Sequence, residues 1–466
     1  MLLLLVLAVA LGLRTYALGA RPMHADEANQ ALKLGQMLEG GTYAFDPRDH
    51  HGPTLYYLGL VPAGLRGETT LATLTETTVR LTPALFGVVG VWLLWLLLRP
   101  WGRWPALTAA LLLAVSPAAV YYSRYFIQET LLVTFTLGTF VVGRRWWKDG
   151  GVRWAVLAGA GFGLMLATKS SALVYAPVAL LGLVMSRRPV AAGLRWGLDA
   201  GIMAGSALCV AILFYSSFGG HPAGLRDALV TPGSMFAKVL GGASGHEKPW
   251  WYYLRLFFWQ SNGGYHWDQT VFLLPAVAGG VIAWRRSGLP RFLAVFTATL
   301  AAILSATPYK TPWLILILLP GMCALAALAL TRLPRGTAPV FTLLVLLGLG
   351  WQTRQAVFQR PADSRNPFAY AHTSADMLKV PALAAAAPAG PVKVISQEYW
   401  PLPWYLRRRP ETGYWTSPPA DCDGALVFAD VPQADAVRSR LHGKYQESFL
   451  GLRPGFVLVV FARQGK

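Results

Sequence analysis

Long apolar blocks recur along almost the whole chain, and they constrain its fold more than any other feature. The 466 residues are 54% hydrophobic and only 14% charged, more apolar than a soluble core requires. Eleven blocks can be delimited: Leu2–Leu18, Thr82–Leu98, Ala106–Tyr122, Leu131–Val142, Trp154–Ala167, Ala172–Met185, Trp196–Phe214, Val271–Trp284, Phe292–Thr307, Trp313–Leu330 and Ala338–Trp351. The pattern predicts an all-α polytopic membrane bundle of about eleven transmembrane helices. No basic segment precedes the first block, so we expect a retained helix rather than a cleaved signal peptide.

The distribution of charge predicts the orientation of this bundle. The formal net charge of the chain is +19. Many of its basic residues lie in every second connection between the apolar blocks. These residues are Arg99, Arg103, Arg144, Arg145, Lys148, Arg153, Arg187, Arg188, Arg195, Arg285, Arg286, Arg291, Arg332 and Arg335. The positive-inside rule makes these connections cytoplasmic. We therefore expect a protein of the cell membrane with a cytoplasmic amino terminus, an extracytoplasmic carboxyl terminus, the lipid bilayer as partner and no nucleic acid.

Three large segments fall on the predicted outer side, together with all eight histidines and nearly all the acidic residues. We expect a transmembrane domain over residues 1–351 with outer loops 21–80 and 216–269. Residues 352–466 are predicted to form a small extracytoplasmic α/β domain. Its expected strands and helical stretches are 391–397, 424–429, 455–462, 404–409 and 433–442. The outer face is therefore where we expect the chemistry.

The first outer loop begins with His24, Asp26 and Glu27, directly after the first block. Two adjacent carboxylates at this point are suited to act as a general base or to bind a divalent cation beside a substrate. The structural alternative is that Asp26 is the N-cap of a helix over 27–39. Both interpretations are open at the level of sequence.

A second cluster in the same loop contains Asp49, His50 and His51. Carboxylate and imidazole groups are sufficient ligands for zinc or manganese, although adjacent histidines are not by themselves a known metal spacing. The cluster therefore predicts a divalent metal site as one alternative.

Charged residues also occur in the shorter outer turns. Arg124 and Glu129 flank one turn. We expect that these two side chains either line the floor of an active site or form an ion pair that joins two helix ends. Lys169 and Lys310 each add a cation to this face, against the positive-inside bias, which favours a phosphate ligand. His246 precedes an aromatic stretch typical of a helix at the membrane interface, or of a lipid-substrate entrance.

Taken in order, these motifs resemble the membrane glycosyltransferases of GT-C fold, in the protein O-mannosyltransferase and aminoarabinose-transferase superfamily. The resemblance extends over nearly the whole chain. The residues that carry it at superfamily level are Arg14, His24-Ala-Asp26-Glu27 and Ser123-Arg124-Tyr125 with Glu129. Further motifs look most like the flippase-associated branch of this superfamily in archaea: Asp49-His-His-Gly52-Pro53, His246-Glu-Lys-Pro-Trp250, Tyr309-Lys-Thr-Pro-Trp313 and Asn366-Pro-Phe-Ala-Tyr370-Ala-His372-Thr373.

The resemblance implies transfer of a sugar from a polyprenyl-phosphate-linked donor to a protein, lipid or glycan on the outer face. Asp26 matches the loop carboxylate that acts as base or orients the acceptor, with Glu27 beside it. The residues expected to bind substrate are Arg124, Glu129, Lys169, Lys310, His51 and His246, with the three cations on the donor phosphate. The implied reaction is an inverting displacement. Related loops often carry an acid after the aromatic stretch, whereas this chain has Gln260-Ser261-Asn262 there and its next acid only at Asp268.

Two other classes of protein fit parts of the pattern. A non-catalytic protein that binds lipid-linked sugar, such as a flippase accessory, would need the same outer cations. An ion-coupled carrier is disfavoured because few acidic residues fall in the middle of an apolar block. Substitution of Asp26 by Asn separates the first class from an enzyme, because only the enzyme needs the carboxylate for turnover.

Overall fold

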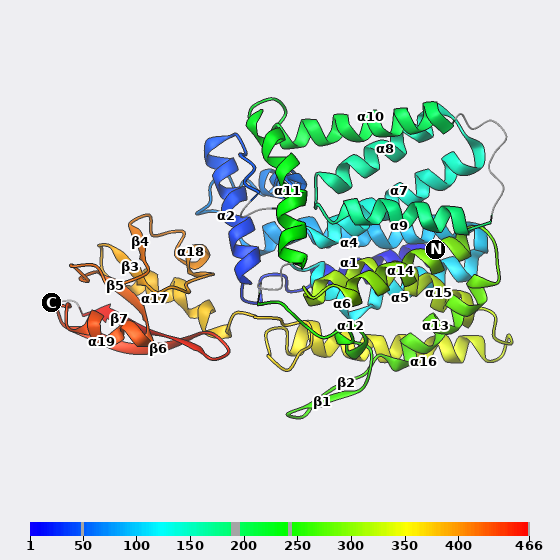
Figure 1. Ribbon diagram of the computed structural model, residues 1–466. Helices are drawn as coiled ribbons and strands as arrows, with labels where there is room; N and C mark the ends of the chain where they lie inside the picture. The colour runs from blue at the N-terminus through cyan, green and yellow to red at the C-terminus, as the bar shows by residue number, and fades with distance from the viewer. Residues whose placement is uncertain (48–50, 188–195, 241–244, 465–466) are drawn as a thin grey trace. The chain divides into compact units, whose positions relative to one another are not determined.

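The computed structural model describes residues 1–47, 51–187, 196–240 and 245–464, and the chain forms two compact units (Figure 1). The first unit consists of Met1–Tyr16, Thr42–Pro62 and Arg80–Pro361. The second unit consists of Ala17–Gly41, Ala63–Val79 and Ala362–Lys466. Two pieces of the predicted first outer loop therefore belong to the same unit as the carboxyl-terminal segment.

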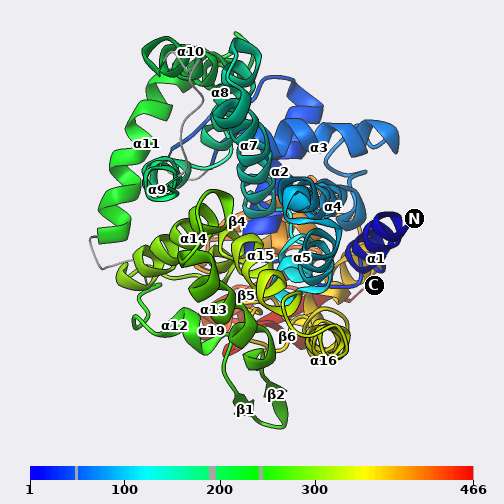
Figure 2. The same cartoon turned by 90° about the vertical axis from the view of Figure 1, so that its right-hand side faces the viewer.

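The first unit is helical, and most of its helices run side by side (Figures 1 and 2). Helix α11 runs transverse to them in both views. The helices that lie wholly or mainly in this unit are α1 (Leu2–Thr15), α3 (Thr54–Leu65), α4 (Glu76–Leu98), η1 (Arg99–Trp101), α5 (Arg103–Val115), α6 (Pro117–Tyr122), α7 (Glu129–Asp149), α8 (Val152–Leu166), α9 (Ala172–Met185), α10 (Trp196–Tyr215), α11 (Ala223–Leu240), α12 (Tyr252–Arg255), α13 (Thr270–Trp284), α14 (Leu289–Ala306), η2 (Pro312–Ile317), α15 (Leu319–Leu330), α16 (Ala338–Thr353) and η3 (Arg354–Gln359). A small hairpin of β1 (Gln260–Asn262) and β2 (Tyr265–Trp267) follows α12.

Four stretches of helix among the described residues are long and apolar enough to cross a membrane: Glu76–Trp101, Gly197–Tyr215, Leu289–Ala306 and Ala338–Gln359. Seven further apolar helices are 10–17 residues long. Each of the eleven predicted blocks overlaps a helix. The predicted mostly helical membrane bundle is therefore confirmed, while the count of eleven spans and the orientation of the termini stay predictions.

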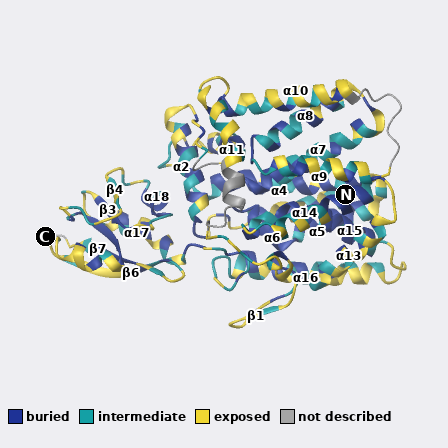
Figure 3. Ribbon diagram, in the orientation of Figure 1, coloured by how far each residue is buried: buried dark blue, intermediate teal, exposed yellow. Residues whose placement is uncertain are grey.

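The outward faces of the bundle are apolar, which is typical of contact with lipid. On α16, Phe341, Leu343 and Leu347 are exposed by 50%, 55% and 60% (Figure 3). In water such a surface would be unfavourable, because burial of apolar area is the main stabilising contribution in a soluble protein. Helix α15, by contrast, is buried along nearly its whole length between α5, α13 and α14.

Small residues let the helices approach closely. Helix α8 packs on α10 through Gly159 and Gly163. A Cβ atom at these two positions would lie 2.3 Å from the Met203 carbonyl oxygen and 2.6 Å from the Ala207 carbonyl oxygen. This is the small-residue packing by which membrane helices associate when no hydrophobic driving force acts between them.

The second unit contains a five-stranded sheet of order β4-β3-β5-β7-β6. Its strands are β3 (Val392–Ile395), β4 (Thr412–Trp415), β5 (Leu426–Asp430), β6 (Tyr445–Arg453) and β7 (Phe456–Arg463). Strands β4, β3 and β5 are parallel, whereas β7 is antiparallel to both β5 and β6. The predicted strands 391–397, 424–429 and 455–462 correspond to β3, β5 and β7. Strands β4 and β6 lie at the two edges and are more exposed, so their apolar pattern is weak in the sequence.

Short helices accompany this sheet, and side chains from the amino-terminal half complete the unit. The helices are α2 (Ala25–Gly40), η4 (Ala375–Lys379), α17 (Val380–Ala386), α18 (Leu402–Tyr405), η5 (Val431–Gln433) and α19 (Ala434–Arg438). The Trp404 indole nitrogen donates to the Glu76 carboxylate at 2.7 Å, and Arg407 donates to the Leu74 carbonyl at 2.9 Å. Residues more than 300 positions apart thus share one core.

Helix α2 begins two residues earlier than expected. The N-cap is His24, so the alternative that Asp26 caps a helix over 27–39 is wrong. The Nδ1 atom of His24 accepts a hydrogen bond from the Asp26 backbone N–H at 3.1 Å, and the Glu27 carboxylate accepts from the His24 backbone N–H at 3.1 Å. These two bonds satisfy amide donors that a helix start leaves without intrahelical partners. The side chain of Asp26 is left available for another role.

Candidate active site

The start of α2 places the two predicted catalytic carboxylates in different environments. Glu27 is fully buried, and its carboxylate forms an ion pair at 3.0 Å with Arg21, which is 6% exposed. The same oxygen accepts from the His24 backbone N–H. Glu27 is therefore engaged in holding the loop together, and a buried charge of this kind depends on its partner.

The Asp26 side chain is 52% exposed, and its carboxylate lies 3.9 Å from the His24 Nδ1 atom. Within the described part of the chain, no hydrogen bond reaches this carboxylate. Its position in the first turn of α2 favours a negative charge, because the helix start carries a partial positive charge. Asp26 is thus a solvent-accessible carboxylate on a rigid, capped helix end, as a general base requires.

His24 connects the start of α2 to the carboxyl-terminal segment. Because Nδ1 accepts from Asp26, the ring proton sits on Nε2, which donates to the Tyr370 carbonyl oxygen at 3.1 Å. The neighbouring Met23 backbone N–H donates to the Tyr405 hydroxyl at 2.8 Å. Both contacts join residues more than 340 positions apart, so sequence spacing gives no signal for them.

A second buried histidine lies against His24. The ring of His372 is 5.7 Å from the ring of His24, and its Nδ1–H donates to the Thr373 carbonyl at 3.0 Å. Burial, and then the positive charge of Arg21, hold the pKa of His372 well below its ordinary value of 6.5. The ring is therefore neutral at neutral pH. The motif that opens the carboxyl-terminal segment thus supports the loop that carries Asp26.

The first unit holds the predicted phosphate-binding cations, beginning with Arg124. Its guanidinium donates to the carbonyl oxygens of Leu13, Arg14 and Tyr16 at 3.3, 3.2 and 2.6 Å, at the end of α1. It also lies over the Phe358 ring at 5.1 Å. Arg124 therefore caps α1, where terminal carbonyls attract a cation.

Glu129 pairs with Lys169, across two helix ends. The Lys169 ammonium donates to the Glu129 carboxylate, and the two residues are 8% and 6% exposed. The sequence offers an ion pair of Glu129 with Arg124 as one alternative, whereas the salt bridge at the Glu129 carboxylate is with Lys169. Ser171 and Tyr175 line a small hollow beside the pair. The ion pair holds the Lys169 side chain in place between the two helix ends.

The segment that follows His51 docks on the turn that carries Lys169. The Gly52 backbone N–H donates to the Thr168 carbonyl at 3.0 Å, and the Thr54 and Thr168 hydroxyls lie 2.8 Å apart. A Cβ atom at Gly52 would lie 2.1 Å from the Ala167 carbonyl oxygen, so only glycine fits. His51 itself is exposed at the end of this contact.

Lys310 joins two connecting segments of the first unit. It is 1% exposed, and its ammonium donates to the carbonyl oxygens of Thr307 and Lys248, the latter at 3.2 Å. Its backbone N–H donates to the His246 carbonyl at 3.0 Å, and the rings of His246 and Tyr309 lie 5.2 Å apart. Burial lowers the pKa of Lys310. The predicted partners His246 and Lys310 are thus brought together.

Of the predicted metal ligands, Asp49 and His50 lie outside the described residues. His51 is described and exposed. Elsewhere in the described ranges, no group of three or more His, Cys, Asp or Glu side chains is arranged to hold a metal ion. The divalent metal stays a prediction.

Comparison with known proteins agrees with this architecture. The family model described as dolichyl-phosphate-mannose-protein mannosyltransferase matches residues 60–215. No curated protein sequence matches the chain. The crystal structure of ArnT from Cupriavidus metallidurans bound to undecaprenyl phosphate superposes with a TM-score of 0.67 at 15% identity, covering 98% of this chain and 97% of ArnT. The archaeal oligosaccharyltransferase AglB from Archaeoglobus fulgidus, in complex with an inhibitory peptide and a dolichol-phosphate, gives a TM-score of 0.57 at 14% identity, covering 96% and 72%.

The chain therefore shares the fold of the GT-C membrane glycosyltransferases ArnT and AglB. The resemblance expected from the motifs is therefore confirmed at the level of the fold, over nearly the whole chain. The narrower archaeal flippase-associated branch stays a prediction.

Proposed function

We propose that this protein is a membrane glycosyltransferase that moves a sugar from a polyprenyl-phosphate-linked donor to an acceptor on the extracytoplasmic face. The acceptor class is a protein, a lipid or a glycan. The proposal is supported by the shared fold with ArnT and AglB, whose structures carry undecaprenyl phosphate and dolichol-phosphate. It places the protein in the cell membrane with its amino terminus in the cytoplasm, in line with the basic connections.

The state of Asp26 carries the proposal. Of the two adjacent acids, Glu27 is buried and paired with Arg21, while the Asp26 carboxylate is 52% exposed on a backbone fixed by His24. A general base must reach a substrate proton and keep an accessible oxygen. We therefore propose that Asp26 is the general base and that Glu27 and His24 hold the start of α2, which carries Asp26, in position.

In the proposed reaction, the acceptor hydroxyl oxygen forms a bond to the anomeric carbon of the sugar. The bond from that carbon to the phosphate oxygen of the lipid breaks on the opposite face, so the configuration inverts. Asp26 takes the hydroxyl proton, and the polyprenyl phosphate leaves with the electron pair and its negative charge. Such a leaving group needs no protonation.

The cations of the first unit are proposed to stabilise the phosphate charge. Lys169 is the best suited, because its ion pair with Glu129 fixes the position of its ammonium group. Arg124 and Lys310 donate hydrogen bonds to backbone carbonyls. We propose that they act on the donor phosphate through their positive charge and by holding the loops around it in place. His51 and His246, which adjoin these loops, are proposed to contact the donor.

The experiment is transfer of radiolabelled sugar from polyprenyl-phosphate donors in membranes that contain wild type, Asp26→Asn or Asp435→Asn at matched protein levels. Asp435 is the charge-matched control, because it is 94% exposed on α19 and remote from this loop in the sequence. We expect Asp26→Asn to lose transfer by on the order of 10² or more, and Asp435→Asn to keep it. Retained transfer in Asp26→Asn would overturn the assignment of the base.

Transfer from none of the donors, with lipid-linked sugar still bound, would favour the flippase-accessory alternative. For the phosphate role, we expect Arg124→Ala and Lys310→Ala to raise the KM for the donor more than the KM for the acceptor. Equal effects on both constants would contradict that role.

A further inference from the structure

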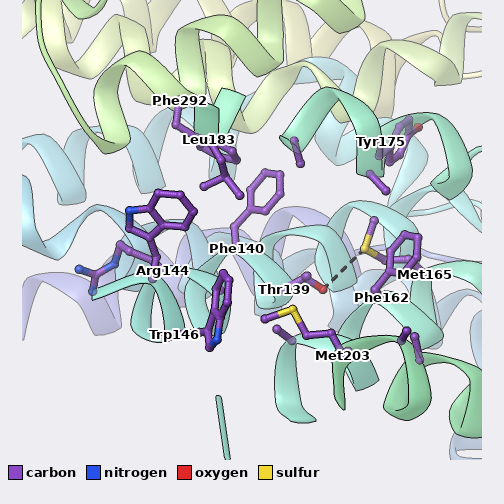
Figure 4. Close-up of a pocket in the computed structure, with 18 of the residues that line it drawn as sticks. Thr139, Phe140, Arg144, Trp146, Phe162, Met165, Tyr175, Leu183, Met203 and Phe292 are labelled. Atoms are coloured by element: carbon purple, nitrogen blue, oxygen red, sulfur yellow. Dashed lines mark hydrogen bonds between the residues drawn. The ribbon is translucent and has the colours of Figure 1, made fainter. Parts of the chain in front are cut away.

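Donor and acceptor must be bound together in a direct displacement, so they need separate surfaces. The first unit contains an apolar cavity of about 500 Å³, with Phe140 among its lining side chains (Figure 4). Tyr175 lines both this cavity and the hollow beside the pair of Lys169 and Glu129. The cavity therefore belongs with the site proposed for the lipid-linked donor. The acceptor is then left to the second unit, which contains Asp26.

The second unit presents a surface where its parallel strands end. Strands β4, β3 and β5 lie side by side and run in parallel, so their carboxyl ends meet at one edge of the sheet. After β3 the chain passes to β4 on one side, whereas after β5 it passes to β6 and β7 on the other. In sheets of parallel strands, ligands bind outside the carboxyl ends at the place where the connections diverge in this way. We call residues 396–400, 414–417, 430–433 and 453–456 the strand-end surface.

Three aromatic rings meet at the strand-end surface. The ring of Tyr399 lies 6.0 Å from that of Trp400 and 5.0 Å from that of Tyr414. Tyr414 is 36% exposed, and the other two residues are half-buried. The next residue in β4, Trp415, packs on the core beneath α19, so Tyr414 points to the opposite face of the sheet. The cluster thus presents an aromatic ring and a phenol hydroxyl to solvent.

A carboxylate and a guanidinium belong to the same surface. Glu398 directly precedes Tyr399, and its carboxylate pairs with Arg453 at 2.8 Å. Their side chains are 52% and 31% exposed, so both can reach a ligand. The carboxylate accepts hydrogen bonds and the guanidinium donates them, while the two charges cancel. A neutral sugar matches this surface, because its C–H face packs on an aromatic ring and its adjacent hydroxyls bond to planar charged groups.

The segment that carries these rings leads to the proposed general base. Trp400 is followed by α18, which packs on α2, and the first turn of α2 carries Asp26. The Tyr405 hydroxyl of α18 accepts a hydrogen bond from the Met23 backbone N–H at 2.8 Å. The strand-end surface and Asp26 are therefore joined within one unit by direct contacts.

We propose that the strand-end surface binds a neutral glycan and that this glycan is the acceptor of the transfer. Tyr399 and Tyr414 stack on its sugar rings, and Glu398 and Arg453 bond its hydroxyls. The role as acceptor rests on the proposed function, because Asp26 then deprotonates one hydroxyl of the bound glycan. The binding of the glycan itself does not depend on transfer.

The test is saturation-transfer-difference NMR of the full chain in phosphatidylcholine nanodiscs. The probes are maltohexaose, mannohexaose and chitotetraose, with a peptide rich in serine and threonine as the probe for a protein acceptor. We expect a signal from the ring C–H protons of at least one glycan. Tyr414→Ala should weaken its binding by about tenfold, the effect of losing one aromatic stacking contact, whereas Tyr414→Phe should keep it. Phe449→Ala is the control, because Phe449 is 66% exposed on β6 and pairs with Val459 of the core on the opposite face.

If Tyr414→Ala does not fold, Glu398→Gln decides the matter, because this exposed change should weaken glycan binding by about fivefold through the loss of a charged hydrogen-bond acceptor. No signal from any of the glycans, a signal that both variants leave unchanged, or a signal from the peptide alone would overturn the proposal.

A transfer assay on the same preparations separates this inference from the proposed function. Tyr414→Ala should raise the KM for the acceptor by about tenfold and leave the KM for the donor within about twofold of wild type. Transfer with an unchanged acceptor KM in Tyr414→Ala would overturn this inference and leave the proposed function standing. Glycan binding that depends on Tyr414, without transfer from any donor, would refute the proposed function and keep the glycan site.

Discussion

The ion pair of Arg21 and Glu27 gives the sharpest prediction for stability. Glu27 is 0% exposed and Arg21 6%, and the Glu27 carboxylate also accepts from the His24 backbone N–H. Glu27→Gln removes the negative charge and leaves Arg21 buried without it. Breaking a buried pair on one side costs about 3–5 kcal/mol. At about 2–4 °C per kcal/mol for a unit of this size, the unfolding midpoint of the second unit should fall by roughly 6–20 °C.

The assay is thermal unfolding of the purified protein in detergent, followed by hydrogen exchange of the α2 amides so that the second unit is observed directly. Asp26→Asn is the matched control, because it is the same kind of change one residue away, at a position 52% exposed. A surface substitution of this sort changes stability by about 0.5 kcal/mol or less. Arg21→Met combined with Glu27→Gln should recover part of the loss, since no uncompensated charge remains.

Equal destabilisation by Asp26→Asn and Glu27→Gln would refute the reasoning, because the two carboxylates would then not occupy different environments. A loss for Glu27→Gln below about 1 kcal/mol would refute it as well, since that is the range of an exposed ion pair.

Three further outcomes follow from the same contacts. His24→Asn should keep the helix cap but lose the bond to the Tyr370 carbonyl, so that the free energy of unfolding changes by about 1 kcal/mol while the turnover rate falls more than the donor KM changes; a turnover loss that occurs in His24→Ala but not in His24→Asn would show that only the cap matters. Lys169→Met should lower the free energy of unfolding by about 3–5 kcal/mol, because it leaves the buried Glu129 carboxylate without its partner. Adding Glu129→Gln to Lys169→Met should restore part of this loss, measured as a rise of the melting midpoint. The pKa of His372 is lower in the folded state than in the unfolded state, so the unfolded state binds more protons and stability should fall as the pH drops below about 6.5. In His372→Gln the melting midpoint should depend less steeply on pH in this range.

The bundle was predictable from sequence because apolar blocks and charge asymmetry are properties of single segments. Strand β5 was predictable for the same reason, since all five of its residues are buried. Strand β6 was not, because four of its nine residues are exposed at a sheet edge and the strand lacks apolar alternation. Helix α11 was missed because it lies in a segment that was assigned to a loop.

The candidate site was predictable only in its residue types. Asp26 and Glu27 look equivalent in sequence, and only the structure shows the contact of Glu27 with Arg21 that separates them. The sequence His24-Ala-Asp26-Glu27 does contain the acid three residues after the cap that is typical of a capping box, with histidine in place of serine or threonine. No comparable local signal exists for His372, whose role depends on a contact between distant parts of the chain.

The most direct test of the central claim separates chemistry from binding at Asp26. Purified wild type and Asp26→Asn would be compared in a single-turnover transfer assay, and the Kd for the polyprenyl-phosphate-linked donor would be measured on the same preparations. We predict that Asp26→Asn lowers the single-turnover rate by on the order of 10² or more while its donor Kd stays within about threefold of wild type. A rate that is unchanged in Asp26→Asn, or a loss fully explained by weaker donor binding, would contradict the assignment of Asp26 as the base.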